Sequence, residues 1–252
     1  MAYDVLFQAY SESALEDRYH FDGNTVAFEL RHGEQWPGDK DRPELKDTGH
    51  EFDRIELSIK PESDPSRWLT QNCSFMYEVR APWEEKFGGG GYIILGQLHC
   101  KAPMFSLRWT PGSETIKPKL WIDFISTKGS TTTHCREIGN ILTALSNGDP
   151  LTVYLETSPK FNSTGSEVIA LNVTATVYPS NRSDLAVKES VDCYPKQLTG
   201  SDNPTIRFKI GAYRRRKDAS HWENLKIYYD NLSIDGAPFP PNLLISPQYN
   251  CR

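Results

Sequence analysis

The chain lacks the features that mark several protein classes. No run of apolar residues approaches the length of a membrane span. The first residues show no basic stretch followed by an apolar one, so no secretory signal peptide is expected. The formal net charge is −5, which argues against a general nucleic-acid binder. We therefore expect neither a membrane nor a nucleic acid as partner, and the oligomeric state is left open.

Cysteine is scarce and irregularly spaced. The five cysteines stand at positions 73, 100, 135, 193 and 251, and no two of them form a C-x-x-C pair. Because such pairs supply the thiolates of structural zinc sites, no metal ligands are predicted. An odd count implies no disulfide framework, although one or two disulfides remain compatible with it.

Short segments with alternating apolar residues are abundant instead. Val26, Phe28 and Leu30 share one face of a predicted strand, and residues 55, 57 and 59 repeat the pattern. Further strands are predicted at 73–80, 92–101, 104–109, 119–125, 151–157, 168–178, 205–214 and 225–234. Turn-forming clusters such as "FGGGG", "TPGS" and "SNGDP" separate them. The pattern predicts an all-β sandwich or jelly roll.

Helical patterns are few. The stretch "HCREIGNILTALSNG" predicts a helix whose apolar stripe is Ile138, Ile141, Leu142 and Leu145, and a short second helix is expected near 11–18. A length of 252 residues suits one all-β domain spanning 1–252. We expect a β-jelly roll of two packed antiparallel sheets, with a concave groove on one open face.

Two predicted strands carry polar side chains on one face. In "LGQLHCK", alternation places Gln97, His99 and Lys101 on the same side. In "TIRFKIGAYRRRK", Phe208, Ile210 and Ala212 form an apolar face. The opposite face of that strand presents Arg207, Lys209, Gly211 and Tyr213. Because Gly211 has no side chain, we expect a ligand to approach the backbone there.

A third polar segment is "DRPELK", in which Arg42, Glu44 and Lys46 share a face. Each segment also has a structural interpretation. Arg42 and Glu44 can form a simple ion pair, and His99 can be a hydrogen-bonded structural residue. Lys209 can lie on the solvated side of an edge strand. The joint occurrence of the three segments, in this order, favours a functional site.

These segments resemble the motifs of the jelly-roll polysaccharide lyases. The motif order R-x-E-L, Q-x-H, F-K-x-G-x-Y stands here as "RPEL" (42–45), "QLH" (97–99) and "FKIGAY" (208–213). The alginate lyases of that fold share all three motifs. The stretches "FELRHGEQWPGDKDRPEL" and "NLKIYYDNLSI" resemble instead the heparin lyase I and glucuronan lyase group. The resemblance covers residues from about 26 to 234.

The resemblance implies cleavage of a uronic-acid polysaccharide by β-elimination. Gln97 and Arg42 are expected to neutralise the uronate carboxylate. His99 is expected to remove the C5 proton, because it titrates near neutral pH. Tyr213 is expected to protonate the departing O4, and one tyrosine can serve as both base and acid. His50 is a second imidazole candidate, and the sequence leaves the choice of base open.

Basic side chains are expected to hold the polyanionic chain. Lys209, Arg207 and Lys101 are predicted substrate contacts, together with Glu44 and His50. If alternation continues through the "RRRK" run, Arg215 joins the same face. The opposite expectation is that this run is a solvated loop.

Two other functions, a glycoside hydrolase and a carbohydrate-binding module, have less support in the sequence. Glycoside hydrolases need two carboxyl groups, and the E-x-D-x-x-E motif of jelly-roll laminarinases is absent. A non-catalytic carbohydrate-binding jelly roll would need aromatic platforms, which Trp36, Trp83, Trp109 and Trp121 can supply. Such a module has little reason to hold Gln97, His99, Lys209 and Tyr213 together.

The remaining expectations concern cofactor, polymer and location. No cofactor is required when side chains neutralise the carboxylate, although related jelly rolls often carry a structural calcium ion. The glucuronan-like flanks favour a glucuronate-containing polymer, such as glucuronan or an acidic bacterial exopolysaccharide. We expect action outside the cell, by a chain whose leader was removed or by a phage-borne depolymerase released on lysis.

Overall fold

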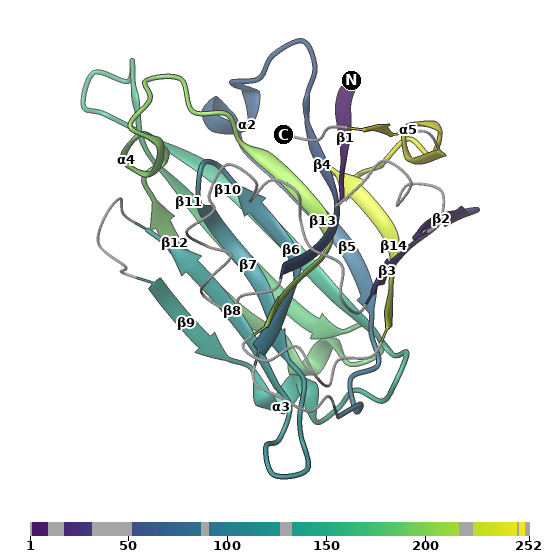
Figure 1. The fold of residues 1–252 in the computed structure, drawn as a ribbon. Helices are drawn as coiled ribbons and strands as arrows, with labels where there is room; N and C mark the ends of the chain where they lie inside the picture. Colours follow the sequence, from purple (N-terminus) through teal and green to yellow (C-terminus); the bar gives the residue numbers. More distant parts are fainter. Residues whose placement is uncertain are drawn as a thin grey trace, which may run out of the picture.

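Two packed β-sheets make up the part of the protein that the computed structural model describes (Figure 1). The described residues are 2–9, 18–31, 52–86, 91–126, 133–216, 224–245 and 247–249. The expectation of an all-β fold with two antiparallel sheets is confirmed, and only the pair at one edge, β1 with β16, is parallel.

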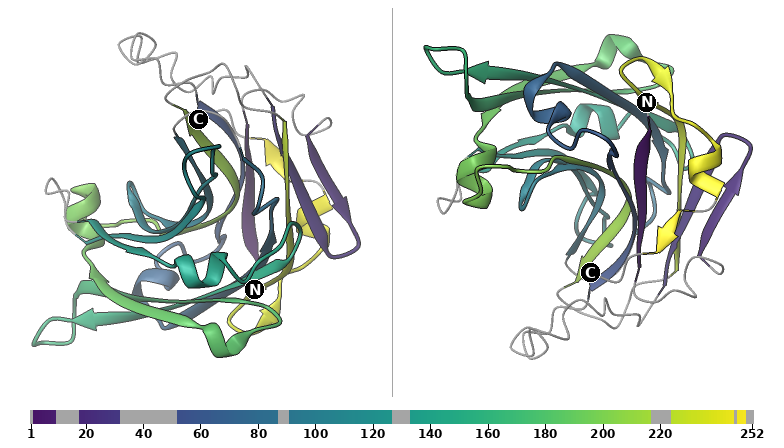
Figure 2. Two further views of the ribbon diagram at one scale, coloured as in Figure 1. Left: turned by 90° about the horizontal axis from the view of Figure 1, so that it is seen from below. Right: turned by 90° about the horizontal axis from the view of Figure 1, so that it is seen from above.

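Sheet A carries the candidate site. In spatial order its eight strands are β16 (Gln248–Tyr249), β1 (Tyr3–Ala9), β4 (Phe52–Pro61), β13 (Arg207–Arg216), β6 (Gly91–His99), β7 (Pro103–Thr110), β8 (Lys119–Ile125) and β9 (Thr133–Glu137). The sheet is strongly curved, and sheet B lies on the outer side of the curve (Figure 2).

Sheet B also has eight strands. Its order is β12 (Val187–Cys193), β11 (Val168–Pro179), β10 (Pro150–Phe161), β5 (Cys73–Arg80), β14 (Leu225–Ile234), β3 (Thr25–Leu30) and β2 (Tyr19–Asp22), with β15 (Ala237–Pro238) paired to β14. All ten strands predicted from the alternating segments are present. Strands β1, β2, β9 and β12 and the two-residue β15 and β16 were not predicted.

The core lies between the two sheets because each strand alternates apolar and polar side chains. Phe208, Ile210 and Ala212 of β13 are fully buried, as predicted, and so are the alternating apolar residues of β4. Burying one such large side chain contributes about 1.5–3 kcal/mol. With its apolar face packed on sheet B, sheet A turns its polar face to the inner side of the curve.

The helices are short: α2 (Arg67–Thr70), α3 (Gly139–Leu142), the 3-10 turn η3 (Ser183–Leu185), α4 (Pro195–Thr199) and α5 (Asn242–Ile245). None of the helices in the described ranges is long and apolar enough to cross a membrane. Most of the helix expected near 11–18 lies outside the described residues.

The prediction of a helix beginning near His134 is wrong for most of its length. Residues 133–137 form the edge strand β9, which pairs with β8, and only Gly139–Leu142 is helical. The predicted stripe of Ile138, Ile141, Leu142 and Leu145 is nevertheless buried. Pairing with the open edge of β8 overrides the local helical pattern, because it satisfies a row of backbone groups.

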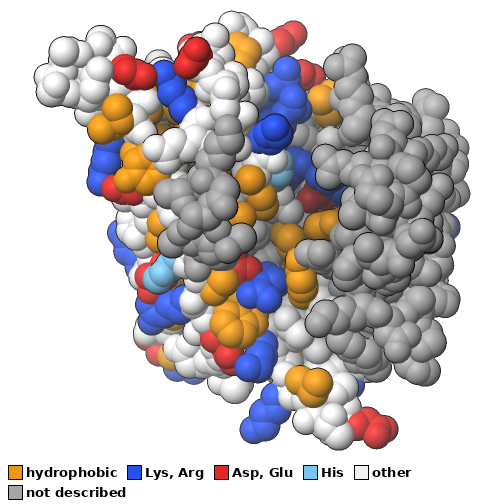
Figure 3. Space-filling view, turned by 60° about the vertical axis from the view of Figure 1, so that its left-hand side comes forward, with side chains coloured by type: hydrophobic (Ala, Val, Ile, Leu, Met, Phe, Trp, Pro, Cys, Tyr) orange, Lys and Arg blue, Asp and Glu red, His pale blue; other side chains and the backbone are white. Residues whose placement is uncertain are grey.

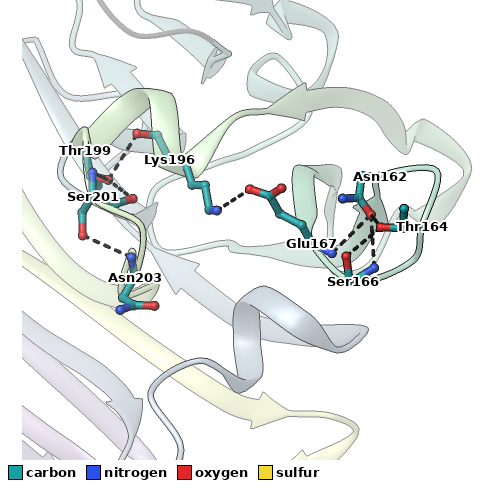
Figure 4. Close-up of polar contacts among 8 residues, drawn as sticks. All are labelled: Asn162, Thr164, Ser166, Glu167, Lys196, Thr199, Ser201 and Asn203. Carbon is teal, nitrogen blue, oxygen red and sulfur yellow. Dashed lines mark hydrogen bonds and ion pairs between the residues drawn. The ribbon is translucent and has the colours of Figure 1, made fainter.

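Side-chain hydrogen bonds stabilise the loop between β10 and β11 and connect it to α4. In the loop between β10 and β11, the Asn162 Oδ1 accepts hydrogen bonds from the backbone N–H of Ser166 at 3.1 Å and of Glu167 at 3.3 Å. Glu167 accepts a hydrogen bond of 2.5 Å from Lys196 of α4 (Figure 4).

Cys73, Cys100, Cys135 and Cys193 are free thiols, so none of them forms the disulfide that the sequence left open.

Candidate functional site

The polar face of sheet A gathers the predicted residues of two motifs. On β13 and β6, Lys209 lies opposite Gln97 and Arg207 lies opposite His99. Tyr213 follows on the same face of β13, between Arg54 of β4 and Ile94 of β6. Figure 3 looks toward this side of the molecule, where basic and hydrophobic side chains lie next to one another.

A β-bulge makes this arrangement possible. Between the pairs Lys209–Gln97 and Tyr213–Ile94, β13 advances four residues and β6 only three. Between the pairs Gln97–Ser106 and Ile94–Arg108, β6 advances three residues and β7 two. An odd step reverses which side chains face inward. Ile94 and Gln97 therefore share the polar face, although an unbroken strand would place them on opposite faces.

Two tyrosines of sheet B meet the bulge from the core. The Tyr229 hydroxyl lies 2.7 Å from the Gly211 carbonyl and 3.0 Å from the Leu95 carbonyl. The Tyr77 hydroxyl is buried and has no hydrogen-bond partner in the described part of the chain. A Cβ added at Gly96 would lie 2.3 Å from that hydroxyl. The Tyr229 hydroxyl, which carries one hydrogen, thus donates to the carbonyls of the bulge from the core side.

Gly211 has a different role from the one predicted. We expected its missing side chain to admit a ligand. A Cβ at this position would lie 2.4 Å from the Ile55 carbonyl oxygen and 2.6 Å from the Glu56 Cα, and the residue has a φ of +126°. The glycine is therefore required by the close backbone of β4 and by its conformation.

A buried cluster of charged groups lies beside Gly211. The Glu56 carboxylate lies 3.6 Å from the Lys209 Nζ and 2.5 Å from the Arg54 Nε. Gln8 of β1 accepts hydrogen bonds from Lys209 at 3.1 Å and from Arg54 at 3.3 Å. Glu56 and Lys209 are only 1% and 4% exposed. Lys209 is therefore a buried residue of a central strand, not the solvated side of an edge strand.

Burial and pairing set the protonation states in this cluster. Burial lowers the pKa of Lys209 to about 8, and the neighbouring Glu56 carboxylate only partly opposes this effect. Burial alone would raise the pKa of Glu56, but Arg54 and Lys209 hold it below its usual value. At neutral pH the cluster therefore carries one buried anion and two cations.

His99 is held in one tautomer. Its Nδ1 lies 2.5 Å from the Cys100 carbonyl oxygen, which can only accept, so Nδ1 carries the proton and Nε2 keeps a free lone pair. Burial, with Lys209 adding to it, lowers the pKa of His99 to about 3. The expectation that His99 titrates near neutrality is therefore wrong, because the ring is neutral there.

Gln97 and Tyr213 complete the group. Gln97 is 4% exposed and lies between Lys209 of β13 and Ser106 of β7. Its amide can donate and accept hydrogen bonds, so it is suited to a polar ligand on this face. Tyr213 is partly buried, and the Arg54 guanidinium carbon lies 5.6 Å from the centre of its ring.

Several predicted residues are not brought into the group. Arg42, Glu44, Lys46 and His50 lie outside the described residues. Lys101 does not share a strand face with Gln97, because β6 ends at His99 and the chain bends at residues 100–102. Arg207, by contrast, does join the group: it lies opposite His99 and is partly buried.

The "RRRK" run begins inside a strand. The backbone of β13 continues to Arg216, and Arg215 lies opposite Tyr92 and Phe52. The expectation that the whole "RRRK" run is a loop is therefore wrong for residues 214–216. The side chains of 214–216 lie outside the description, so the predicted contact by Arg215 stays a prediction.

Arg54 and Gln8 were missed by the motif search. The R-x-E-L pattern occurs twice, and the second occurrence is Arg54–Leu57 within β4. The signal that favoured Arg54 was the regular strand alternation of "RIELSIK". The other occurrence, "RPEL", contains a proline, which is unfavourable inside a strand. Gln8 had no such signal, because its strand reaches the site only through pairing with β4.

The tryptophans suggested as sugar platforms mostly belong to the core. Trp83 and Trp109 are 1% and 0% exposed, so neither can stack on a sugar. Trp36 lies outside the described residues, and Trp121 on the polar face of sheet A is partly exposed. Among the residues that the structure describes, no group of three His, Cys, Asp or Glu is arranged to hold a metal ion.

Comparisons with known proteins identify the fold. An alginate lyase from Klebsiella pneumoniae matches with a TM-score of 0.57 at 15% identity, over 88% of this chain and 85% of that one. A PL7 alginate lyase from Zobellia galactanivorans matches with a TM-score of 0.53 at 16% identity, over 89% of this chain and 81% of that one.

At such low identity, this likeness shows the fold alone. The predicted jelly roll is confirmed, and the structure is similar to those of jelly-roll alginate lyases. No protein-family model matches the sequence, and no curated protein matches it. The resemblance to the heparin lyase I and glucuronan lyase group stays a prediction.

Proposed function

We propose that this protein is a polysaccharide lyase that cleaves a uronate-containing polysaccharide by β-elimination on the polar face of sheet A. The observation that carries the proposal is the joint placement of Gln97, His99, Lys209 and Tyr213 on one face of two paired strands. The jelly-roll fold supports it, because the structurally similar proteins from Klebsiella and Zobellia are alginate lyases.

The first requirement of the reaction is to neutralise the uronate carboxylate. Removing the C5 proton pushes charge into this group, so donors placed there stabilise the transition state. The Gln97 amide supplies such donors, and Lys209 lies opposite it. We assign the R-x-E-L arginine role to Arg54, which lies beside Tyr213. The same role for Arg42 stays a prediction.

The second requirement is a base for the C5 proton and an acid for the departing O4. His99 suits the base role because its neutral ring keeps a lone pair on Nε2, although its low pKa makes it a weak base. Tyr213 suits the acid role, and it can take both roles when C5–H and O4 lie on the same side of the sugar ring. The geometry favours neither assignment of the base, and His50 is a further candidate.

The finer parts of the proposal concern substrate and location. We propose a glucuronate-containing polymer, such as glucuronan or an acidic bacterial exopolysaccharide, because of the two flanking stretches that resemble glucuronan lyases. We propose that the reaction needs no cofactor and takes place outside the cell. The described side chains can neutralise a carboxylate by themselves.

The test is a panel of uronate polymers incubated with purified protein. β-Elimination creates a conjugated double bond that absorbs ultraviolet light, so absorbance should rise as the polymer shortens. New reducing ends without new absorbance would show hydrolysis instead. Binding without any cleavage would favour a carbohydrate-binding module.

A Tyr213→Phe variant tests the assignment of the acid. The change keeps the ring and removes the proton donor, so the protein should fold normally and turnover should fall by roughly 10²–10⁴-fold. His99→Gln, measured beside it, separates the two mechanisms for the base. Turnover within a few-fold of the parent in His99→Gln would leave Tyr213 as both base and acid.

A further inference from the structure

The polar face of sheet A continues beyond the candidate catalytic group, onto β7, β8 and β9. Arg108 of β7 lies directly opposite Ile94 of β6, which itself lies opposite Tyr213. Trp121 of β8 follows in the same row, opposite Arg108. Strand spacing places Arg108 about 10 Å from Tyr213 across two strands. One sugar ring cannot reach both residues, so this region would meet another sugar of the same chain.

The Arg108 guanidinium is fixed in place. Its Nε and Nη2 donate to the two carboxylate oxygens of Asp123 at 2.5 and 3.1 Å. The rings of Tyr92 and Trp121 flank it from the strands on either side, with centroids 5.3 and 5.0 Å from its central carbon. A guanidinium held this way loses little conformational freedom when it donates its remaining N–H groups to a ligand.

Arg108 and Lys119, the described cations of this region, are each paired with a carboxylate. Asp123 accepts hydrogen bonds from the two N–H groups of Arg108 that could otherwise bind the carboxylate of a ligand. Lys119 lies 3.2 Å from Glu137. Cys135, opposite Asp123, adds no charge at neutral pH, because burial and Asp123 raise the pKa of its thiol to about 11. In the candidate catalytic region, Arg54 and Lys209 both contact the described carboxylate of Glu56.

Trp121 provides an aromatic surface for a sugar ring, beside the mutually neutralised Arg108–Asp123 pair. It is partly exposed, unlike the buried Trp83 and Trp109. The C–H face of a pyranose can pack on an aromatic ring, while an arginine–carboxylate pair offers both donors and acceptors to its hydroxyl groups. A uronate in this position would instead place its carboxylate beside Asp123.

We infer that Trp121, Arg108 and Asp123 form a second sugar-binding subsite that takes an uncharged sugar of the bound chain. This inference rests on the proposed lyase function and narrows its substrate. The preferred polymer is a heteropolysaccharide in which uronates are interspersed with neutral sugars, rather than a homopolymer of uronate.

The first experiment needs no turnover. A soluble cello-oligosaccharide, which is uncharged, is titrated into the wild-type protein and into Trp121→Ala, and binding is followed by protein NMR. Wild type should bind, and Trp121→Ala should weaken binding roughly five- to ten-fold through loss of the aromatic contact. No binding by wild type, or equal binding by both proteins, would overturn the subsite.

The second experiment tests the charge argument through Asp123→Asn. This variant leaves Arg108 without its counter-charge, so KM on a pure polyuronate should fall roughly two- to five-fold, and more at low salt. KM on a polymer with interspersed neutral sugars should stay unchanged or rise. An unchanged ratio of kcat/KM between the two polymers would overturn the preference for a neutral sugar.

A matched control is Asp184→Asn. Asp184 pairs with Arg182 by the same two-bond geometry, at 2.9 and 2.8 Å, but lies in η3, between two strands of sheet B. It should leave both polymers unaffected. If wild type forms no unsaturated product from any polymer, the proposed lyase function fails. The cello-oligosaccharide titration then still decides whether the subsite exists.

Discussion

The two sheets share one alternating pattern but use their polar faces differently. On sheet B, Lys160 of β10 and Asp192 of β12 pair at 2.5 Å, with side chains 51% and 32% exposed. Hydroxyl contacts between β11 and β12, such as Thr174 to Ser190 at 2.9 Å, also lie at the surface. On sheet A, Glu56 and Lys209 pair at 3.6 Å with side chains only 1% and 5% exposed.

This difference in exposure determines how much free energy each ion pair costs the folded protein. An exposed pair keeps most of its hydration, so it contributes little to stability and costs little. A buried pair loses that hydration, and an apolar pair of similar volume would often be as stable. The buried cluster on sheet A therefore points to a function.

The largest expected effect comes from breaking the buried cluster. Glu56→Gln removes the described buried carboxylate that pairs with Lys209 and Arg54, so the free energy of unfolding should fall by about 3–5 kcal/mol. Asp192→Asn breaks the exposed pair of sheet B and should cost at most about 1 kcal/mol. Urea unfolding of both variants measures the contrast, and equal losses would mean that the two faces do not differ energetically.

The second effect concerns the bulge that aligns the candidate site. Tyr229→Phe removes the donor to the Gly211 and Leu95 carbonyls, so kcat should fall roughly 10- to 100-fold as Gln97 and Tyr213 lose their alignment, and stability should fall by about 1–3 kcal/mol. The control is Tyr77→Phe, an equally buried ring whose centroid lies 5.8 Å away and whose hydroxyl has no partner in the described chain.

Tyr77→Phe should leave both quantities unchanged. A loss of stability without a loss of kcat in Tyr229→Phe, assayed well below the unfolding temperature, would limit Tyr229 to a structural role. Hydrogen exchange at the amides of residues 96–98 and 211–213 gives a second measurement, independent of activity. Faster exchange in Tyr229→Phe only would show that its hydroxyl holds the bulge.

Most of the fold could be predicted from the sequence, because local alternation decides which residues enter a core. The failures occurred where pairing with distant strands decided the structure. Residues 134–137 became strand β9 because β8 offers an open edge. Strand β1 went unrecognised although it brings Gln8 next to β4.

The candidate site was predictable only within single strands. Alternation correctly placed Lys209 and Tyr213 on one face, and likewise Gln97 and His99. The sequence did not show the bulge between Ile94 and Gln97, which depends on the register between three strands. Nor could it show that Glu56 lies against Lys209 and Arg54, because that contact needs two strands to be paired.

The third prediction uses pH to test whether the partly buried His99 is shielded from solvent. The pKa of His99 is lowered to about 3, so between pH 6.5 and 3 the unfolded chain binds a proton that the folded chain refuses. Stability should therefore fall as pH drops through that window. His99→Gln should flatten this decline, as measured by the free energy of urea unfolding at each pH.

Glu56 adds to the decline with the same sign. Its folded pKa lies below its usual value, so its stabilising charge is lost at acid pH. Part of the slope should thus remain in His99→Gln at the lowest pH. A slope identical in wild type and His99→Gln would show that the His99 ring is hydrated and titrates as an exposed histidine does.

The smallest expected effect tests the exposed side of the comparison. A double-mutant cycle of Lys160→Ala and Asp192→Ala should give a coupling of only about 0.2–1 kcal/mol, and less at high salt. Asp192 also accepts a 2.7 Å hydrogen bond from the Asn172 amide, so the Asp192 variant alone loses more than the ion pair. The loss of the Asn172 hydrogen bond occurs whether or not Lys160 is present, so it cancels in the coupling energy. A coupling above about 2 kcal/mol would mean that exposure does not separate the two faces, and the argument that burial marks the functional one would no longer hold.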